Sequence, residues 1–283
     1  MKKFKLLFNT SRPVSWVNTA YPFAAGYLVM GGSVDARLIL GTLFFLIPYN
    51  LMMYGINDVF DYESDIRNPR KGGAEGAITP KKYHPLIIQS SILSSLPFVV
   101  LLISMGSPVS ALALLSVIFF VVAYSTKGLR FKEIPFLDSI TSSLHFVGPL
   151  IYAYTLVGAT PDAWLAALAF FAWGIGSQSF GAVQDVQPDR EAGIKSIATV
   201  LGARRTIWFS ASMYTLAVAL TALVGGPGLI VAASGLMYTA NVMEFRNITD
   251  ATSARARRGW KRFIWINYAA GAIVTICLIL SKV

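Results

Sequence analysis

The sequence predicts an all-α integral membrane protein with nine transmembrane helices bundled around a cytoplasm-facing cavity. Of the 283 residues, 55% are hydrophobic and only 13% are charged, whereas a soluble domain carries about 25% charged residues. Several apolar stretches reach the roughly 20 residues that a helix needs to cross a bilayer. Nearly all lysines and arginines fall in alternate connections between these stretches, which is typical of a multi-pass protein.

The predicted spans follow one another with little polar sequence between them. No polar stretch is long enough to fold separately, so a single domain is expected over residues 1–283. The residues before the first span contain no small-residue cleavage site, which argues against a cleaved signal peptide. The nine spans are predicted at residues 14–31, 37–56, 86–104, 108–125, 136–157, 161–182, 205–222, 226–243 and 262–281.

The distribution of basic residues predicts the orientation in the membrane. The N-terminus and the connections after the second, fourth, sixth and eighth spans contain 22 of the 24 lysines and arginines. The positive-inside rule places this side in the cytoplasm, so we expect a multi-pass protein of the cell membrane with a cytoplasmic N-terminus. The net charge of +10 then reflects topology and attraction to anionic lipid, and no nucleic-acid partner is needed to explain it.

Two short acidic motifs, each with an amide before its first aspartate, follow the second and sixth predicted spans. They read NDVFDYESD at residues 57–65 and QDVQPD at residues 184–189. Their recurrence suggests two four-helix halves with matching acidic ends, followed by a ninth helix. In the first motif the amide and the acids recur every three or four residues, so they share one face if the second helix continues beyond the membrane.

The second motif contains a proline that is expected to interrupt its helix. Pro188 disfavours a helical conformation at Gln187, so the sixth helix is expected to break there. Asp189 would then lie in the first turn of a short new helix over residues 188–202.

Acidic side chains that face one cavity need a source of positive charge. They repel one another unless a cation joins them or their pKa values rise. Mg²⁺ prefers hard oxygen ligands and is usually held by a few carboxylates together with substrate phosphates. We therefore expect Mg²⁺ and a phosphate-bearing substrate, against the alternative of a solvated acidic loop. The candidate metal ligands are Asn57, Asp58, Asp61, Asp65, Asp185 and Asp189, of which the five aspartates are also the candidate catalytic residues.

Further substrate-binding candidates lie near the motifs. Asn18 is inside the first span, where a polar side chain is costly, and it either lines the cavity or forms an interhelical hydrogen bond. Tyr124 could stabilise a cation through its ring, although ordinary packing is the commoner role of such a residue. Basic residues nearby could supply the rest of the charge balance: Arg67, Arg70, Lys71, Lys127, Arg130, Arg190 and Lys195.

Three other residues have structural explanations as well as functional ones. His145, in the fifth span, could accept a proton, but a hydrogen-bonded structural histidine is the more ordinary role. Asp138 begins the same helix and is expected to interact with its N-terminal dipole. Cys277 is the only cysteine, which excludes an intrachain disulfide and a cysteine-based metal site.

The motifs resemble those of the UbiA superfamily of intramembrane prenyltransferases. NDVFDYESD matches the pattern N-D-x-x-D-x-x-x-D, and DVQPD matches D-x-x-x-D. The resemblance implies a UbiA-like bundle of nine helices and a prenyl diphosphate bound through Mg²⁺. Longer stretches are similar to the lycopene elongase branch over nearly the whole chain, among them IPYNLMMYGINDVFDYESDIRNPRKGG and GAVQDVQPDREAGIKSIATVLGAR.

That branch implies a particular reaction and particular substrates. Dimethylallyl diphosphate would supply dimethylallyl units to the ends of lycopene or a related polyene from the lipid phase, with the acceptor end then hydrated or deprotonated. Gly174 and Gly176 in the sixth span could line the entry for the polyene, or serve close helix packing. Three alternatives stay open. The same chemistry could act on another acceptor, such as a quinone precursor, a chlorin or a glycerol lipid. The protein could instead be a Mg²⁺-dependent membrane transporter or a non-catalytic scaffold.

Overall fold

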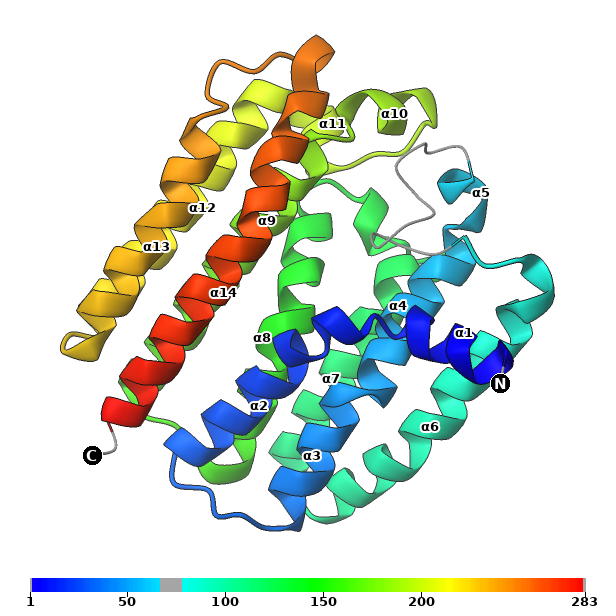
Figure 1. Cartoon of the computed structure of the whole chain (residues 1–283). Helices are drawn as coiled ribbons and strands as arrows, with labels where there is room; N and C mark the ends of the chain where they lie inside the picture. The colour runs from blue at the N-terminus through cyan, green and yellow to red at the C-terminus, as the bar shows by residue number, and fades with distance from the viewer. Residues whose placement is uncertain (1, 67–77, 282–283) are drawn as a thin grey trace. The chain divides into compact units, whose positions relative to one another are not determined.

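The computed structural model describes residues 2–66 and 78–281, and within these ranges the chain forms helices and connecting segments without a strand (Figure 1). Contacts divide the chain into two compact units. Unit 1 consists of Met1–Phe131 with His145–Ala159, and unit 2 of Lys132–Leu144 with Thr160–Val283. Each unit therefore contains one of the two acidic motifs.

Unit 1 is built around α4, which packs against α1, α3, α6 and α7. Helix α2 packs against α3, and short 3₁₀ turns join several of the helices. The helices of this unit are α1 (Lys2–Thr10), α2 (Val17–Val29), α3 (Ala36–Leu46), α4 (Pro48–Phe60), α5 (Tyr62–Asp65), α6 (His84–Ser104) and α7 (Pro108–Ser125).

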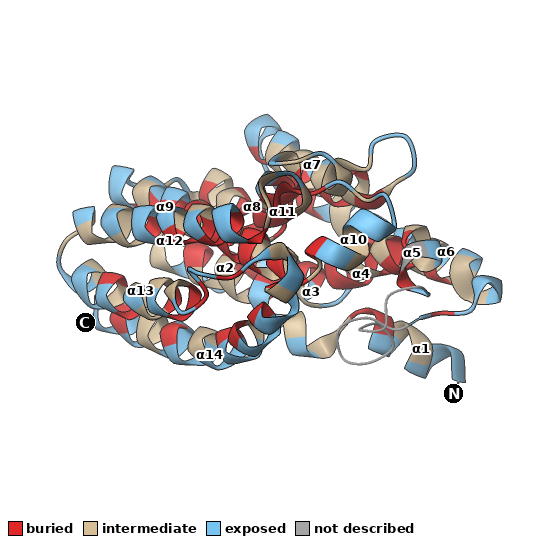
Figure 2. Ribbon diagram, turned by 90° about the horizontal axis from the view of Figure 1, so that it is seen from above, coloured by how far each residue is buried: buried red, intermediate tan, exposed pale blue. Residues whose placement is uncertain are grey.

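Unit 2 is built around α12, which packs between α9 and α13, while α14 packs against α13 and α9. Figure 2 shows buried residues gathered where α9 and α12 meet. The helices are α9 (Pro161–Val183), α10 (Val186–Glu191), α11 (Ile197–Leu201), α12 (Ala203–Leu223), α13 (Pro227–Met243) and α14 (Ala256–Leu280), with a 3₁₀ segment η4 at Asp250–Arg255.

The fifth helix, α8 (Leu137–Val157), belongs to both units. Its first turns lie in unit 2 and the rest in unit 1. The last predicted span, α14, packs within unit 2, and the division into two four-helix halves plus a ninth helix stays a prediction.

The predicted spans agree with the helices to within a few residues at most ends, with one clear difference. The second predicted span is two helices, because the chain bends at Ile47, whose φ is −118° and ψ is −64°. Pro48 follows, and a proline lacks the N–H that would continue the helix and disfavours a helical residue before it. The apolar pattern could not reveal this bend, since hydrophobic residues continue on both sides of it.

The chain is a multi-pass membrane protein. In the described residues, seven helical segments are long and apolar enough to cross a bilayer. The other two predicted spans correspond to α13, with 17 residues, and α2, with 13 residues. Nine crossings therefore stays a prediction.

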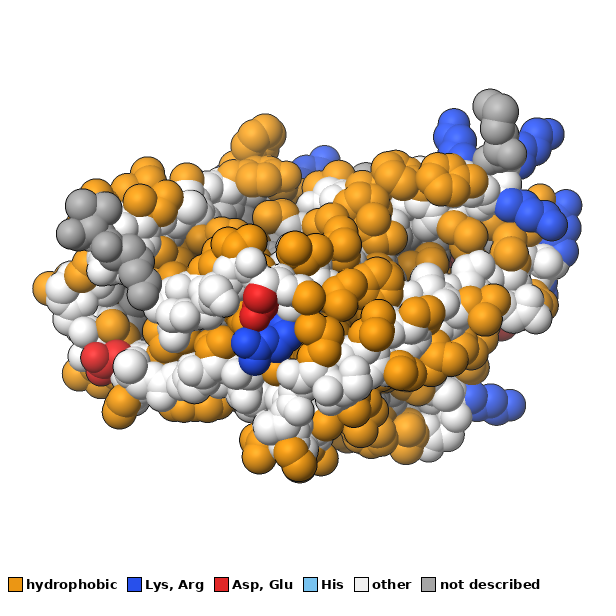
Figure 3. Space-filling view, turned by 90° about the horizontal axis from the view of Figure 1, so that it is seen from below, with side chains coloured by type: hydrophobic (Ala, Val, Ile, Leu, Met, Phe, Trp, Pro, Cys, Tyr) orange, Lys and Arg blue, Asp and Glu red, His pale blue; other side chains and the backbone are white. Residues whose placement is uncertain are grey.

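Large hydrophobic side chains cover much of the exterior. Leu93 on α6, Leu112 on α7 and Trp265 on α14 are each more than 60% exposed. Such exposed side chains are expected where helices contact lipid hydrocarbon rather than water. Figure 3 looks onto the helix ends at the bottom of Figure 1, where hydrophobic side chains are also common and charged ones few.

Glycines allow close helix packing inside unit 2. A Cβ on Gly174 would lie 2.2 Å from Ser143 Oγ, and one on Gly176 would lie 3.1 Å from the Ser210 carbonyl oxygen. Ser143 Oγ also donates to the Phe171 carbonyl at 2.7 Å. These contacts support the packing role of both glycines, and their role in a polyene entry stays a prediction.

Candidate active site

The first acidic motif lies where α4 ends and α5 begins. The Asp61 N–H donates to the Asn57 carbonyl at 2.9 Å, and the Asp65 N–H donates to the Asp61 carbonyl at 2.8 Å. The helical hydrogen-bond pattern thus continues through the junction at Asp61. This confirms the expected continuation of the second helix, which places Asn57, Asp61 and Asp65 on one side of it.

The three aspartates of this motif are buried. Asp58, Asp61 and Asp65 are only 3%, 7% and 8% exposed. Buried carboxylates need hydrogen bonds or opposite charges. The Asn57 amide nitrogen supplies one such bond, because it donates to Asp61 Oδ2 at 2.8 Å and also to Ser125 Oγ on α7 at 3.0 Å.

Two arginines from other segments approach these carboxylates. Arg12 Nη2 lies 2.8 Å from Asp58 Oδ1, and the Arg12 guanidinium lies 4.2 Å from the centre of the Tyr54 ring. Arg130 Nη2 lies 3.9 Å from Asp61 Oδ1. Arg130 thus lies beside the motif, and its role in neutralising a diphosphate stays a prediction. Arg12 was missed because it was interpreted only as a topology signal, although it lies just before the first predicted span begins in earnest at α2.

The second acidic motif differs from its prediction in detail. α9 ends at Val183 and α10 begins at Val186, so the break falls near Asp185 and Gln187 is helical. Pro188 is tolerated because it lies in the first turn of α10, where a backbone N–H has no partner within the helix.

The single helix expected over residues 188–202 is also wrong. It is replaced by α10 and α11 with a bend that includes Gly193 at a φ of +72°. Glycine adopts this left-handed conformation without the steric cost of a Cβ. Asp189 does lie in the first turn of α10, as expected.

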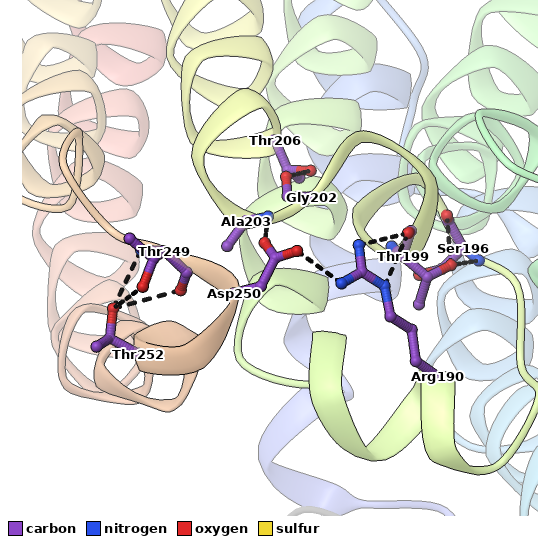
Figure 4. A network of polar contacts seen from close by, with 9 residues as sticks. All are labelled: Arg190, Ser196, Thr199, Gly202, Ala203, Thr206, Thr249, Asp250 and Thr252. Carbon is purple, nitrogen blue, oxygen red and sulfur yellow. Dashed lines mark hydrogen bonds and ion pairs between the residues drawn. The ribbon is translucent and has the colours of Figure 1, made fainter.

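Arg190, directly after the second motif, joins α10 to α11 and to η4 (Figure 4). Its Nη1 donates to Asp250 Oδ2 at 2.6 Å, and its Nη2 donates to the Thr199 carbonyl at 2.8 Å. Asp250 Oδ1 accepts from the Ala203 N–H at 2.7 Å. Asp250 was not a predicted site residue, and no local signal marks its partner 60 residues away.

Asp138 has the expected role at a helix start and a second one. Its Oδ1 accepts from the Ser139 N–H at 2.7 Å, at the beginning of α8. Its Oδ2 accepts from the Ile197 N–H at 2.8 Å, at the beginning of α11. This buried carboxylate therefore fixes the segment after the second motif against α8.

His145 and Tyr124 form a packed pair inside unit 1. Their rings meet edge to face with centroids 4.9 Å apart. A ring nitrogen of His145 lies 3.3 Å from the Phe120 carbonyl oxygen, and Tyr49 donates to the His145 carbonyl at 2.9 Å. These contacts favour the structural role of His145 and show Tyr124 packed against it.

The other predicted binding residues are exposed or lie outside the described residues. Asn18 is exposed on α2, and Lys127 and Lys195 are exposed on connections after α7 and α10. Arg67 and Lys71 lie outside the described residues. A buried polar residue is found instead at Asn50, whose amide nitrogen donates to Thr19 Oγ1 at 2.7 Å and to the Phe45 carbonyl at 2.8 Å.

The oxygen atoms of the motifs suit a hard divalent cation. No three acidic, histidine or cysteine side chains in the described ranges are close enough to hold a metal on their own. Mg²⁺ is commonly bound by one or two carboxylates together with substrate phosphates and water. The donor set therefore fits a metal that binds with a diphosphate.

Comparison with known proteins gives the family. Residues 19–267 match the UbiA prenyltransferase family. A lycopene elongase/hydratase of Corynebacterium glutamicum is 50% identical over 281 residues, which cover 99% of this chain and 98% of the relative. The C(50) beta-cyclic carotenoids biosynthesis protein LbtBC of a Dietzia species is 52% identical over 95% of this chain and 63% of that protein.

A solved structure gives the same fold. A UbiA homolog from Archaeoglobus fulgidus bound to DMAPP and Mg²⁺ has a TM-score of 0.69 at 20% identity, covering 93% of this chain and 98% of that one. The fold and the acidic helix ends define a multi-pass helical enzyme of the membrane. The chain belongs to the UbiA prenyltransferase family and is a prenyltransferase.

Proposed function

We propose that this prenyltransferase adds dimethylallyl units from dimethylallyl diphosphate to the ends of lycopene, with Mg²⁺ as its cofactor. The observation that carries the proposal is the 50% identity to a lycopene elongase/hydratase along 99% of the chain. Every aspartate that the two family motifs require is present here. Other acceptors, such as a quinone precursor, a chlorin or a glycerol lipid, are the alternatives to be tested.

The acidic motifs are assigned to the diphosphate end of the reaction. Bound Mg²⁺, which we propose as two ions, would supply positive charge to the diphosphate and its leaving group. Asn57, Asp58, Asp61 and Asp65 would hold one ion, and Asp185 and Asp189 the other. Arg130 would neutralise charge on the departing pyrophosphate, a form of electrostatic stabilisation that often supplies most of an enzyme's rate enhancement. Arg67, Lys71, Lys127 and Lys195 are proposed for the same role.

The chemical step is an electrophilic transfer. The allylic C–O bond breaks and pyrophosphate leaves with the electron pair. The terminal alkene of the polyene then attacks the allylic carbon and forms a new C–C bond. The resulting tertiary cation loses a proton or takes up water. Water must be excluded until the C–C bond has formed, because it would otherwise capture the first cation as an alcohol.

The proposal places the enzyme in the cell membrane, with both acidic ends reaching one diphosphate at a cavity open to the cytoplasm. The positions of Asp58 and Asp61 at the end of a candidate span, rather than in its middle, support an enzyme over an ion pathway. Spin labels at Glu63→Cys and Gln187→Cys, in a Cys277→Ala background, test the shared site. A distance too long for one diphosphate to bridge would contradict it.

Expression in a cell that accumulates lycopene tests the acceptor directly. Pigment masses should rise by one or two five-carbon units, with or without added water. Labelled dimethylallyl diphosphate supplied to membranes should put label into carotenoid. Label found only in quinone or glycerolipid would overturn lycopene as the acceptor while leaving the prenyltransferase assignment in place.

A further inference from the structure

The N-terminal segment reaches the first acidic motif through one arginine. Arg12 follows α1 and precedes the 3₁₀ turn at Pro13–Ser15, far from the motif in sequence. Its Nη2 nevertheless lies 2.8 Å from Asp58 Oδ1. The Asp58 side chain is 1% exposed and that of Arg12 is 21% exposed, so water screens this pair weakly.

The surroundings of Arg12 hold its guanidinium in one place. Its face lies over the Tyr54 ring at 4.2 Å, one turn of α4 before Asp58. Trp16 Nε1 donates to the Ser11 carbonyl at 3.0 Å, and Ser11 is buried. Arginine can stack its planar guanidinium on an aromatic ring and form an ion pair at the same time, whereas lysine cannot.

The backbone of Arg12 is unusual for a residue with a side chain. Its φ of +50° and ψ of +74° lie in the left-handed region. A non-glycine residue there carries a steric cost, and such residues gather where the surrounding structure or a function requires them. This conformation therefore occurs at the residue whose side chain pairs with Asp58.

We propose that Arg12 is a positioning residue for Asp58, which holds this carboxylate in the orientation needed for the metal–diphosphate complex. This inference rests on the proposed function, because it assigns a role in binding that substrate class. Residues that hydrogen-bond to metal-binding carboxylates commonly change metal affinity by about 10- to 100-fold when they are removed. Arg12 acts through Asp58 and needs no contact with the substrate itself.

Two variants separate the side chain from the backbone. Arg12→Gly removes the guanidinium and relieves the left-handed strain, whereas Arg12→Gln removes the charge and keeps the strain. Arg37→Gln is the matched control, because Arg37 also pairs with an aspartate, Asp35, at 2.9 Å and lies 5.9 Å from a tyrosine ring. That pair stands at the start of α3, away from both motifs in sequence.

The test uses the full chain in nanodiscs, with Mn²⁺ and a non-hydrolysable thio analogue of dimethylallyl diphosphate as probes. Free Mn²⁺ measured by electron paramagnetic resonance gives the affinity without turnover. Both Arg12 variants should weaken binding at least about 10-fold, with Arg12→Gly unfolding at the wild-type temperature. They should raise KM for the allylic diphosphate and leave KM for the acceptor unchanged. Arg37→Gln should bind as the wild type does.

The outcomes distinguish the two proposals. Wild-type affinity in Arg12→Gly would overturn the inference and leave the proposed function standing. Weakened binding that merely follows a lower unfolding temperature, in Arg12→Gly and Arg37→Gln alike, would also overturn it, since it would indicate a structural role. If the wild-type chain binds neither probe, the proposed function itself fails.

Discussion

The arginines near the two acidic motifs make different contacts. In unit 1, Arg12 comes from a distant segment and pairs directly with the motif carboxylate of Asp58. In unit 2, Arg190 is adjacent to the motif in sequence but turns to Asp250 and the Thr199 carbonyl (Figure 4). Proximity in sequence to an acidic motif is therefore a poor guide to which cation serves it.

The difference also concerns how each motif is held. The first motif continues the helix that contains it, so its side chains are placed by α4 itself. The second lies on a short helix after a break, and short helices have little stability of their own. Arg190 and Asp250 supply the tertiary contacts that α10 lacks internally. A continuous helical segment thus positions the first motif, whereas the tertiary contacts of Arg190 and Asp250 position the second.

The largest expected effect comes from neutralising one acid at each end. Asp58→Asn and Asp185→Asn should each lower prenyl transfer by roughly 10²-fold or more, as losses of electrostatic stabilisation do. Transfer of labelled dimethylallyl units by membranes measures this, with protein amount checked on a blot. Near-normal transfer by either variant would show that only one end participates.

Helix packing in unit 2 should be the next most sensitive feature. In Gly174→Ala the added Cβ would lie 2.2 Å from Ser143 Oγ, so we expect a loss of about 1–3 kcal/mol in the free energy of unfolding. Gly271→Ala is the control, because no atom lies within 4 Å of its new Cβ and alanine favours helix. Denaturant titration in detergent compares the two. Equal stabilities would mean that α8 and α9 can separate without cost.

The Arg190 network should give a smaller and coupled effect. Asp250→Ala removes both the ion pair and the acceptor for the Ala203 N–H, for a loss of about 1–2 kcal/mol. Arg190→Gln should cost less, about 0–1 kcal/mol, because the pair is roughly 40% exposed. A double-mutant cycle should show that the effects are not additive.

Activity separates a structural role of Arg190 from a chemical one. If Arg190 only holds α10 in place, both variants should lower transfer to a similar, several-fold extent. A much larger loss in Arg190→Gln than in Asp250→Ala would mean that Arg190 contacts the diphosphate. The contrast between the two acidic ends would then disappear.

The smallest effect is expected at an exposed ion-pair cluster outside both motifs. Hydrogen bonds from Arg262, and then from Arg258, lower the pKa of Glu244. Because the pKa of the folded carboxyl is lowered, its ion pairs stabilise the fold at pH values above the ordinary carboxyl pKa near 4.3. This stabilisation is lost as the pH falls through the lower pKa of the folded state. Glu244→Gln should therefore cost at most about 1 kcal/mol at pH 7.

The pH and salt dependence of the Glu244 cluster provide the check. The difference between wild type and Glu244→Gln should be constant from pH 7 to 5 and shrink below about pH 4. High salt should reduce it, because exposed charges are screened. A difference that grows on acidification would contradict the ion-pair explanation.

Much of the candidate site could be read from local sequence. The recurrence of Asn57, Asp61 and Asp65 at intervals of four predicted one helical side, and the backbone hydrogen bonds confirm it. The break near the second motif was predicted two residues too late, because Pro188 was expected to be the first residue of the new helix and is instead the third residue of α10. Proline lacks an N–H in either case, so sequence alone does not distinguish the two.

Residues that act across the fold were the ones missed. Arg12 and Asp58 are 46 residues apart, and Arg190 and Asp250 are 60 apart. Asn50 is fully buried, yet its partners on neighbouring segments could not be inferred from its place in an apolar run. Asn18, next to one of those partners in sequence, was chosen instead and is exposed.

The sequence by itself determined the membrane class, the approximate helices and the two acidic motifs. These are local properties, because a bilayer selects apolar runs of a given length and a helix repeats every 3.6 residues. Only the tertiary structure decided which arginine meets which carboxylate, and that α8 is shared between the units. Such pairings depend on how helices pack, and a buried charge finds its partner through space rather than along the chain.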